Sequence, residues 1–248
     1  MGNMLEVNDL SVSIEGKKVL DSVRLAVKAG EVHALLGRNG SGKSSLALTL
    51  MGHPKYTITS GEILFEGVSI NGWSATERAR AGIFLSFQNP PALPGVVTGQ
   101  LLRASLRATQ AGVPSSARQA RERIRAEAKD LGIAESFLGR SFNDGFSGGE
   151  RKRMEALQYR LLKPKLSVFD ETDSGLDRDA VRLVCDRIRE TRSPERAIIV
   201  ITHYHRMLEA LEPTHVHFLQ DGTIERSGDM SLARTIDLSG FSAVTDVR

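Results

Sequence analysis

A glycine-rich segment near the N-terminus has the residue types and spacing of a phosphate-binding loop. It reads Gly37-Arg-Asn-Gly-Ser-Gly-Lys-Ser44 and fits the pattern G-x-x-x-x-G-K-[ST]. Gly37, Gly40 and Gly42 let successive backbone N–H groups, such as those of Arg38, Asn39 and Ser41, point inward and hold phosphate oxygens. Lys43 has the reach to contact the β- and γ-phosphates, and the Ser44 hydroxyl is a ligand for Mg²⁺. The segment predicts a site for ATP and Mg²⁺.

The residues on either side of this loop supply the elements that it needs. The apolar run 32–36 predicts a buried strand that leads into the loop, and residues 45–51 predict a helix that leaves it. The positive end of that helix, beginning at Ser44 and Ser45, would lie beneath the phosphates. The alternative is a glycine-rich turn with an incidental lysine, which the full pattern makes the weaker interpretation.

Two carboxylates follow a second apolar run. Residues 165–169 predict a core strand, and Asp170 and Glu171 come directly after it. Ligands of parallel sheets bind at the carboxyl ends of the strands. Asp170 would therefore hold Mg²⁺, and Glu171 would polarise a water molecule toward the γ-phosphate. The alternative is a solvated acidic turn, because residues 172–175 have turn-like composition.

His203 and Gln88 complete the set that we expect at this sheet edge. His203 follows the apolar strand 197–201, so its ring is expected near the γ-phosphate, where it would hold water and Glu171 in register. Taken alone, a histidine after a strand is more often structural. Gln88 is expected to touch Mg²⁺ or water and to report the state of the nucleotide to the segment that follows it.

A further motif resembles the signature of ABC-type ATPases. It reads Phe146-Ser-Gly-Gly-Glu150 and precedes a helix expected over 151–162. The resemblance implies that the signature of one subunit caps the nucleotide held by the loop of another, so that catalysis requires two chains packed head to tail. Ser147, Gly148 and Gly149 would form the second anion cradle, with Glu150 beside them. Ser174-Gly-Leu-Asp177 is similar to the segment that couples the two sites, which makes Asp177 a candidate residue.

Within these ATPases the chain is most similar to the SufC family, which serves iron–sulfur cluster assembly. The similarity extends from Leu5 to about Phe241, and it is carried by residues 86–96, 145–154, 169–177, 201–205 and 216–222. It implies an ATPase that docks on SufB-like and/or SufD-like scaffold subunits, with the contact expected around Gln88 to Val97, and that moves them by ATP-driven dimerisation. The chain has one cysteine, Cys185, and cluster ligation normally needs several thiolates, so it cannot hold a cluster alone.

Two other functions stay open at this point. One is an ATPase subunit of an ABC membrane transporter, and the other is a nucleotide-gated binding module with little turnover. Glu171 and His203 argue against the module, because both are suited to hydrolysis. The residues after Gln88 and after Glu171 favour Suf assembly over transport.

Composition limits the remaining classes. The 33 basic and 30 acidic residues give a net charge of +3, too small for a nucleic-acid-binding stripe. Four arginines cluster at 118, 121, 123 and 125, and they share their segment with Glu122 and Glu127, which favours a solvated helix face. No apolar run approaches the roughly 20 residues of a membrane span, and no secretory signal is visible. We expect a cytoplasmic protein that binds no nucleic acid and does not insert into a membrane.

Strand and helix patterns predict an α/β fold for a single ABC-type ATPase domain. Its parts would be a P-loop core with a mainly parallel sheet, an antiparallel β subdomain and an inserted helical subdomain. The helical subdomain is expected at about 96–159, and the core with the β subdomain at about 1–95 and 160–248. Residues 5–27 predict paired antiparallel strands.

Three further features of the sequence concern nucleotide and metal binding. No aromatic residue stands in 15–20, where related ATPases stack adenine, so base selectivity is expected to be relaxed. Ser45 replaces a usual threonine and keeps the hydroxyl. His215 and His217 share one face of an expected strand, but without nearby carboxylates or thiols they are not expected to bind a metal.

Overall fold

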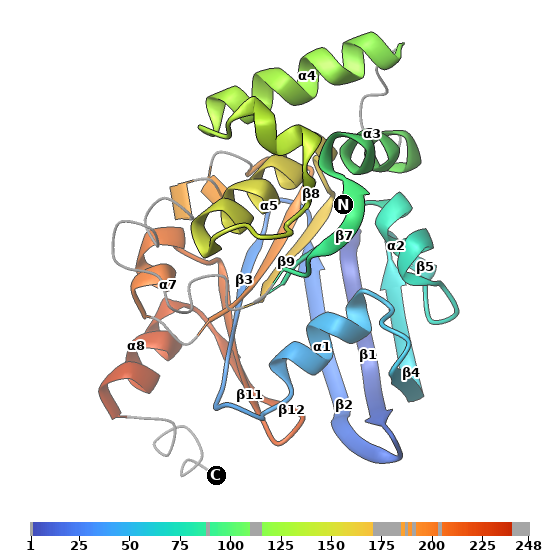
Figure 1. The fold of residues 1–248 in the computed structure, drawn as a ribbon. Coiled ribbons are helices and arrows are strands. Elements are labelled where there is room, and N and C mark those ends of the chain that lie inside the picture. The colour runs from blue at the N-terminus through green and yellow to red at the C-terminus, as the bar shows by residue number, and fades with distance from the viewer. Residues whose placement is uncertain are drawn as a thin grey trace. The chain divides into compact units, whose positions relative to one another are not determined.

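The chain divides into two compact units in the computed structural model. One unit comprises Met1–Arg78, Ile83–Gln88 and Lys165–Arg248, and the other comprises Ala79–Gly82 and Asn89–Pro164 (Figure 1). The structure describes residues 2–87, 90–109, 116–170, 185–186, 188–189, 192–202 and 205–239.

A six-stranded, mainly parallel sheet forms the centre of the first unit. Its strand order is β12-β11-β3-β10-β9-β6, and β12 alone runs antiparallel to its neighbour. Every residue of β3, β9 and β10 is buried, as expected for apolar runs covered on both faces of a parallel sheet. The strands are β3 (Val32–Leu36), β6 (Ile83–Ser86), β9 (Leu166–Asp170), β10 (Ala197–Ile201), β11 (His215–Gln220) and β12 (Thr223–Gly228).

A four-stranded antiparallel sheet packs in the same unit, with the order β2-β1-β4-β5. The paired strands expected within 5–27 are confirmed, because β1 and β2 form a hairpin around the turn at Glu15 and Gly16. Buried residues alternate with exposed ones along β2, the pattern of a sheet with one face on the core. The strands are β1 (Asn3–Ile14), β2 (Lys17–Lys28), β4 (Tyr56–Phe65) and β5 (Val68–Ser69).

Among the described residues, four helices begin in this unit. They are α1 (Lys43–Leu50), α2 (Ala75–Ala81), α7 (His205–Leu211) and α8 (Met230–Ser239). Leu208 of α7 and Ile236 of α8 belong to one buried cluster with Leu36 and Phe218 of the central sheet. Buried Cys185, with Ile188, confirms the expectation of a core cysteine. Within the part of the chain that the structure describes, no helix has the length and apolar character needed to span a membrane.

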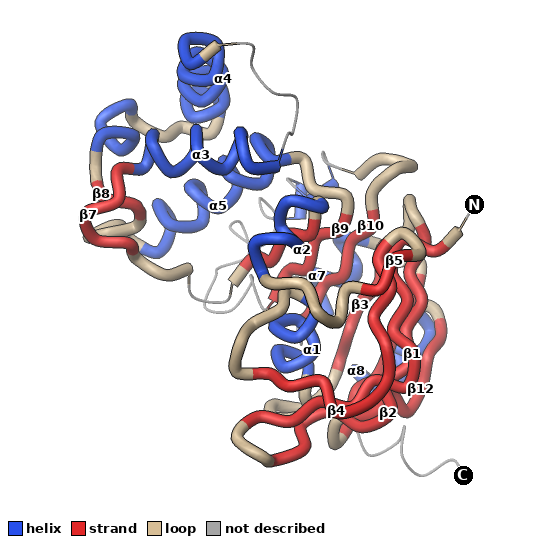
Figure 2. Tube along the Cα trace, turned by 90° about the vertical axis from the view of Figure 1, so that its right-hand side faces the viewer, coloured by secondary structure: helices blue, strands red, loops and turns tan. Residues whose placement is uncertain are grey.

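The second unit is mainly helical (Figure 2). Its elements are β7 (Leu93–Val97), α3 (Thr98–Thr109), α4 (Ala117–Asp130), the 3₁₀ turn η1 (Glu135–Gly139), β8 (Ser141–Phe142) and α5 (Gly148–Leu162). Leu102, Ile124, Met154 and Leu157 are among the residues of its own apolar core. On α4 an exposed ion pair joins Arg118 to Glu122 at 2.7 Å, in keeping with a solvated helix face.

Candidate functional site

The glycine-rich loop connects β3 to α1, and at two of its positions the backbone favours glycine over residues with a side chain. A Cβ at Gly37 would lie 2.2 Å from the carbonyl oxygen of Leu219 and 2.6 Å from Oγ of Ser41. Gly42 has a φ of +108° and forms the N-cap of α1, a conformation that favours glycine. The chain can therefore turn sharply and expose its backbone N–H groups at the start of the helix.

Lys43 is held against this loop. Its side chain is buried, and Nζ donates hydrogen bonds to the carbonyl oxygens of Gly37 at 2.8 Å and Arg38 at 3.0 Å. A buried ammonium needs such acceptors, because desolvation of its charge is costly. The loop thus carries a fixed positive charge beside its own backbone.

The loop also presents donors suited to an anion. The hydroxyl of Ser41 is buried and has no hydrogen-bond partner among the described residues. No side chain caps the N-terminus of α1, so the first-turn N–H groups have no such acceptor. Arg38, Asn39, Gly40 and Ser44 are exposed, and Ser45 is half-buried. The residues fit the phosphate groups of a nucleotide, which would accept hydrogen bonds from these donors.

Ser44 and Asp170 converge from two elements. Asp170 is the last residue of β9 and is 8% exposed, and its Oδ1 accepts a hydrogen bond of 3.2 Å from Oγ of Ser44. Mg²⁺ prefers oxygen ligands at about 2.1 Å in octahedral geometry, which places neighbouring ligands roughly 3 Å apart. The pair therefore fits two positions in the coordination sphere of Mg²⁺.

Four parallel strands end side by side at this edge of the sheet. Ile201 of β10 pairs with Asp170 of β9 and with Leu35 of β3, and Ser86 of β6 pairs with Phe169. The candidate residues that follow these strands lie outside the described residues: Gln88, Glu171, His203 and also Asp177. Their expected roles stay predictions.

The signature segment begins α5 in the second unit. Oγ of Ser147 accepts from the backbone N–H of Glu150 at 3.3 Å, and the N–H of Ser147 donates to Oε2 of Glu150 at 2.7 Å. This reciprocal pair is a capping box. It starts the helix at Gly148, three residues before the expected start at Arg151. The hydrogen bonds from Ser147, together with Arg140 and Arg153, lower the pKa of the Glu150 carboxyl.

Among the described residues, no packing contact requires glycine at Gly148 or Gly149. Both are exposed, and a Cβ built on either residue meets no atom within 4 Å. Glycine has a lower helix propensity than alanine, so two glycines in the first turn of α5 lower its stability. Their presence therefore has to have another reason. Packing within the described residues does not supply that reason.

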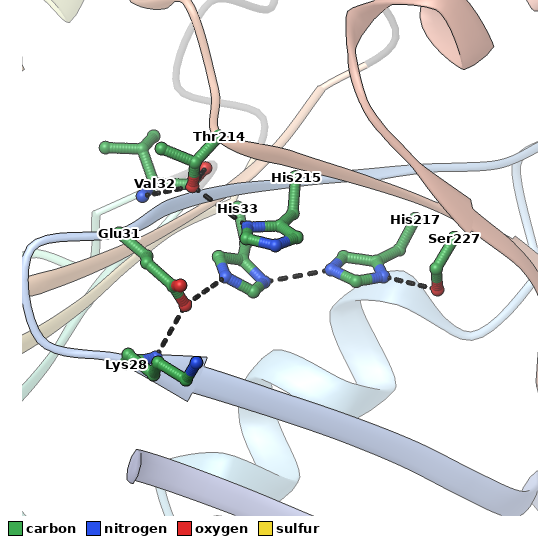
Figure 3. Close-up of polar contacts among 8 residues, drawn as sticks. All are labelled: Lys28, Glu31, Val32, His33, Thr214, His215, His217 and Ser227. Carbon is green, nitrogen blue, oxygen red and sulfur yellow. Dashed lines mark hydrogen bonds and ion pairs between the residues drawn. The ribbon is translucent and has the colours of Figure 1, made fainter. Parts of the chain in front are cut away.

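A histidine cluster lies elsewhere in the first unit, and the sequence analysis missed it (Figure 3). We expected His215 and His217 to have no carboxylate nearby, but this premise is wrong. The β3–β11 pairing brings Glu31 and His33 beside them, since His215 is the register partner of His33. The alternation Glu31-x-His33 at the start of a buried strand was the available signal. Burial, with His33 and His215 nearby, lowers the pKa of His217 to about 3.

Comparison with known proteins agrees with this geometry. The sequence profile of the ABC transporter family matches residues 20–174. A probable ABC transporter ATP-binding protein of Streptococcus pyogenes is 42% identical over 98% of this chain and 95% of its own length. The probable ATP-dependent transporter ycf16 of Pyropia yezoensis is 44% identical and covers 98% of each chain.

Solved structures have the same fold. The structure of an ATP-binding subunit of an ABC transporter superposes with a TM-score of 0.80 at 24% identity, over 98% of this chain and 100% of the other. A dimeric ATP-binding cassette bound to ADP and Pi gives 0.77 at 20% identity, over 92% and 99%. The expected α/β fold of an ABC-type ATPase, with a mainly parallel sheet, an antiparallel sheet and helices, is confirmed. The chain belongs to the ABC transporter family and is an ABC-type ATPase.

Proposed function

We propose that this ATPase drives conformational change in Suf-type scaffold proteins during iron–sulfur cluster assembly. ATP would join two copies of the chain head to tail, and each copy would carry one scaffold subunit. The observation that supports this proposal is that each chain carries two separate parts of a nucleotide site, neither of which is complete. One is a loop equipped for phosphate and Mg²⁺, and the other is an exposed helix start with glycines that its own unit does not need.

Each residue has a defined task in this proposal. Lys43 and the loop N–H groups bind the β- and γ-phosphates, and Ser44 and Asp170 hold Mg²⁺, with Gln88 near it. Mg²⁺ would neutralise charge that develops on the phosphate oxygens. Glu171 polarises the attacking water, and His203 keeps that water and Glu171 in register.

The second copy would supply the other side of the site. Its Ser147 and the N–H groups of Gly148 and Gly149 would approach the γ-phosphate at the start of α5, and its Asp177 would couple the two sites. Gly148 and Gly149 are open to such an approach, because no atom of the described residues stands within 4 Å of a Cβ at either position. A methyl group there would occupy the space that the nucleotide needs.

The segment after β6 has the chemistry of a docking surface for SufB-like or SufD-like subunits. Four large hydrophobic side chains are exposed among the described residues. Two of them, Leu93 and Val96, lie on β7 in the second unit, and a third is Phe87 of the first unit. Exposed apolar side chains gathered in one short segment are typical of protein-binding surfaces. The fourth, Val68, lies on β5 and provides a control.

A second candidate is an ATPase subunit of a membrane transporter. The names of the relatives support it, since they describe a probable transporter ATP-binding protein and a probable ATP-dependent transporter. The same exposed segment would then contact a permease. We favour Suf assembly because the residues after Gln88 and after Glu171 resemble the Suf branch.

Affinity capture from native cells distinguishes the two candidates. The tagged chain is incubated with cytosolic and membrane fractions, and its partners are identified by mass spectrometry. We expect SufB-like or SufD-like proteins from the cytosol, the proposed place of action. Leu93→Asp with Val96→Asp should lose them, and Val68→Asp should retain them. Recovery of a membrane permease instead would establish the transporter candidate and refute ours.

A further inference from the structure

Three polar side chains, from β3, from β11 and from the residue before β3, gather at the start of β3. His33 on β3 and His215 on β11 are register partners, and their rings stack with centroids 4.4 Å apart (Figure 3). Glu31, two residues before His33, places Oε2 3.0 Å from Nε2 of His33. One possible ligand atom from each of Glu31, His33 and His215 lies within 4.8 Å of the others.

The hydrogen bonds of His215 leave one of its ring nitrogens available to bind a metal ion. The hydroxyl of Thr214 donates its single proton to the carbonyl oxygen of Val32 at 2.9 Å. It therefore accepts from Nδ1–H of His215 at 3.1 Å. His215 then carries its proton on Nδ1, and Nε2 has a lone pair with no partner among the described residues. A hydrogen bond to the other ring nitrogen commonly fixes the tautomer of a metal-binding histidine in this way.

His33 has a matching partner behind it. Its Nδ1 lies 2.9 Å from Nε2 of buried His217, and Nδ1 of His217 lies 2.7 Å from Oγ of Ser227. A metal on Nε2 of His33 requires a proton on Nδ1. That proton can be donated to Nε2 of His217, whose own Nδ1–H is then donated to Ser227. The hydrogen bonds among His33, His217 and Ser227 can therefore be satisfied with the proton of His33 on either ring nitrogen.

Charge and spacing also suit a cation. Glu31 accepts from the backbone N–H of Lys28 at 2.7 Å, and no lysine or arginine side chain pairs with it among the described residues. Zinc bonds of about 2.0–2.2 Å place tetrahedral ligands roughly 3.4 Å apart. The 3.0 Å between Glu31 and His33 is close to that value already. The Glu31 side chain is 22% exposed, so it has room to adjust.

We propose that Glu31, His33 and His215 bind one Zn²⁺ ion, with water in the fourth position. Two imidazoles and one carboxylate form a donor set that zinc accepts. The site is separate from the nucleotide site, although both lie in the first unit. Glu31 and His33 stand at the start of β3, and the loop leaves its far end, roughly 13 Å along the strand from His33 at about 3.3 Å per residue.

Zinc binding by the full-length, tag-free protein tests the proposal. ZnCl₂ is titrated calorimetrically after chelation and dialysis, with saturating Mg²⁺ present to compete for the oxygen ligands Ser44 and Asp170. We expect one site per chain, at least tenfold weaker in His215→Ala and in Glu31→Gln. His53→Ala removes an imidazole outside the cluster and should bind zinc as the wild type does.

Cobalt gives a second readout, which reports the coordination geometry of the bound metal. Co²⁺ in a tetrahedral site has strong visible absorption, which should appear in the wild type and in His53→Ala and be absent in His215→Ala. Circular dichroism on each variant verifies that it is folded. Absence of saturable Zn²⁺ binding, or equal binding by the wild type and folded His215→Ala, would overturn the proposal.

Discussion

Replacement of Arg78 should destabilise the helix that carries the phosphate loop. Arg78 is 2% exposed, and its guanidinium donates to five carbonyl oxygens, those of Thr49, Leu50, Ile70, Asn71 and Trp73. The first two belong to the last turn of α1, where the Thr49 carbonyl also accepts from the backbone N–H of Gly52. Burial lowers the pKa of the Arg78 guanidinium.

The magnitude follows from which carbonyl groups keep a partner in Arg78→Met. Thr49 O still accepts from Gly52 N, and Ile70 O from Trp73 N. The carbonyls of Leu50, Asn71 and Trp73 lose the guanidinium, at about 1–3 kcal/mol each. Relief of guanidinium desolvation offsets part of this loss, so we expect a net loss of about 3–5 kcal/mol, as for other broken buried charge networks.

Chemical and thermal unfolding followed by circular dichroism measure this loss. For a chain of this length the midpoint of thermal unfolding should fall by about 10 °C, at about 2–4 °C per kcal/mol. Arg78→Lys keeps the charge but not the planar fork, so its loss should be intermediate. Arg80→Met, exposed on the same helix, is the control and should resemble the wild type. A loss below 1 kcal/mol in Arg78→Met would refute the reasoning.

Three other predictions concern the sites. Gly149→Ala should leave the free energy of unfolding unchanged or raise it by up to about 1 kcal/mol, since its Cβ meets open space. The same variant should lower ATP turnover at least tenfold. Normal turnover would contradict the proposed contribution of a second copy to the site. Asp170→Asn should abolish the Mg²⁺-dependent gain in ATP affinity measured by calorimetry, with ATP affinity in chelator unchanged; a retained gain would remove Asp170 from the Mg²⁺ site. Between pH 6.5 and about 3 the unfolded chain binds a proton at His217 that the folded chain does not, so stability should fall by up to about 1.4 kcal/mol per pH unit on acidification. His217→Asn should lessen that slope in chelator-treated urea unfolding, and an equal slope would contradict the assignment.

Local signals in the sequence were sufficient for the parts of the fold that depend on neighbouring residues. The strand at 32–36, the turn at Glu15 and Gly16, and the loop glycines each have a short-range physical cause, and the structure contains all of them. The start of α5 was expected at Arg151 but is Gly148, because the capping box of Ser147 and Glu150 outweighs the low helix propensity of the glycines.

The same local signals could not predict contacts between residues that are far apart in the sequence. The hydrogen bond from Thr214 to Val32 and the stack of His33 on His215 require the strand order that places β11 beside β3. Nothing in the local pattern of either strand specifies its neighbour. The meeting of Ser44 and Asp170 could be expected, because the spacing of the loop motif and the rule for strand ends each predicted a ligand of the same Mg²⁺ ion.

In the proposed dimer, each ATP is shared by Lys43 of one copy and Ser147 of another. The direct test mixes two variants, Lys43→Ala and Ser147→Arg, each inactive alone, and measures steady-state ATP hydrolysis at high protein concentration.

In a mixed dimer, one site combines the intact loop of one chain with the intact signature of the other. Random pairing in a two-fold dimer would then restore roughly a quarter of wild-type turnover. Recovery near that level, with each variant alone inactive, is the result that we predict. A mixture no more active than the separate variants, although both are folded, would contradict the shared site.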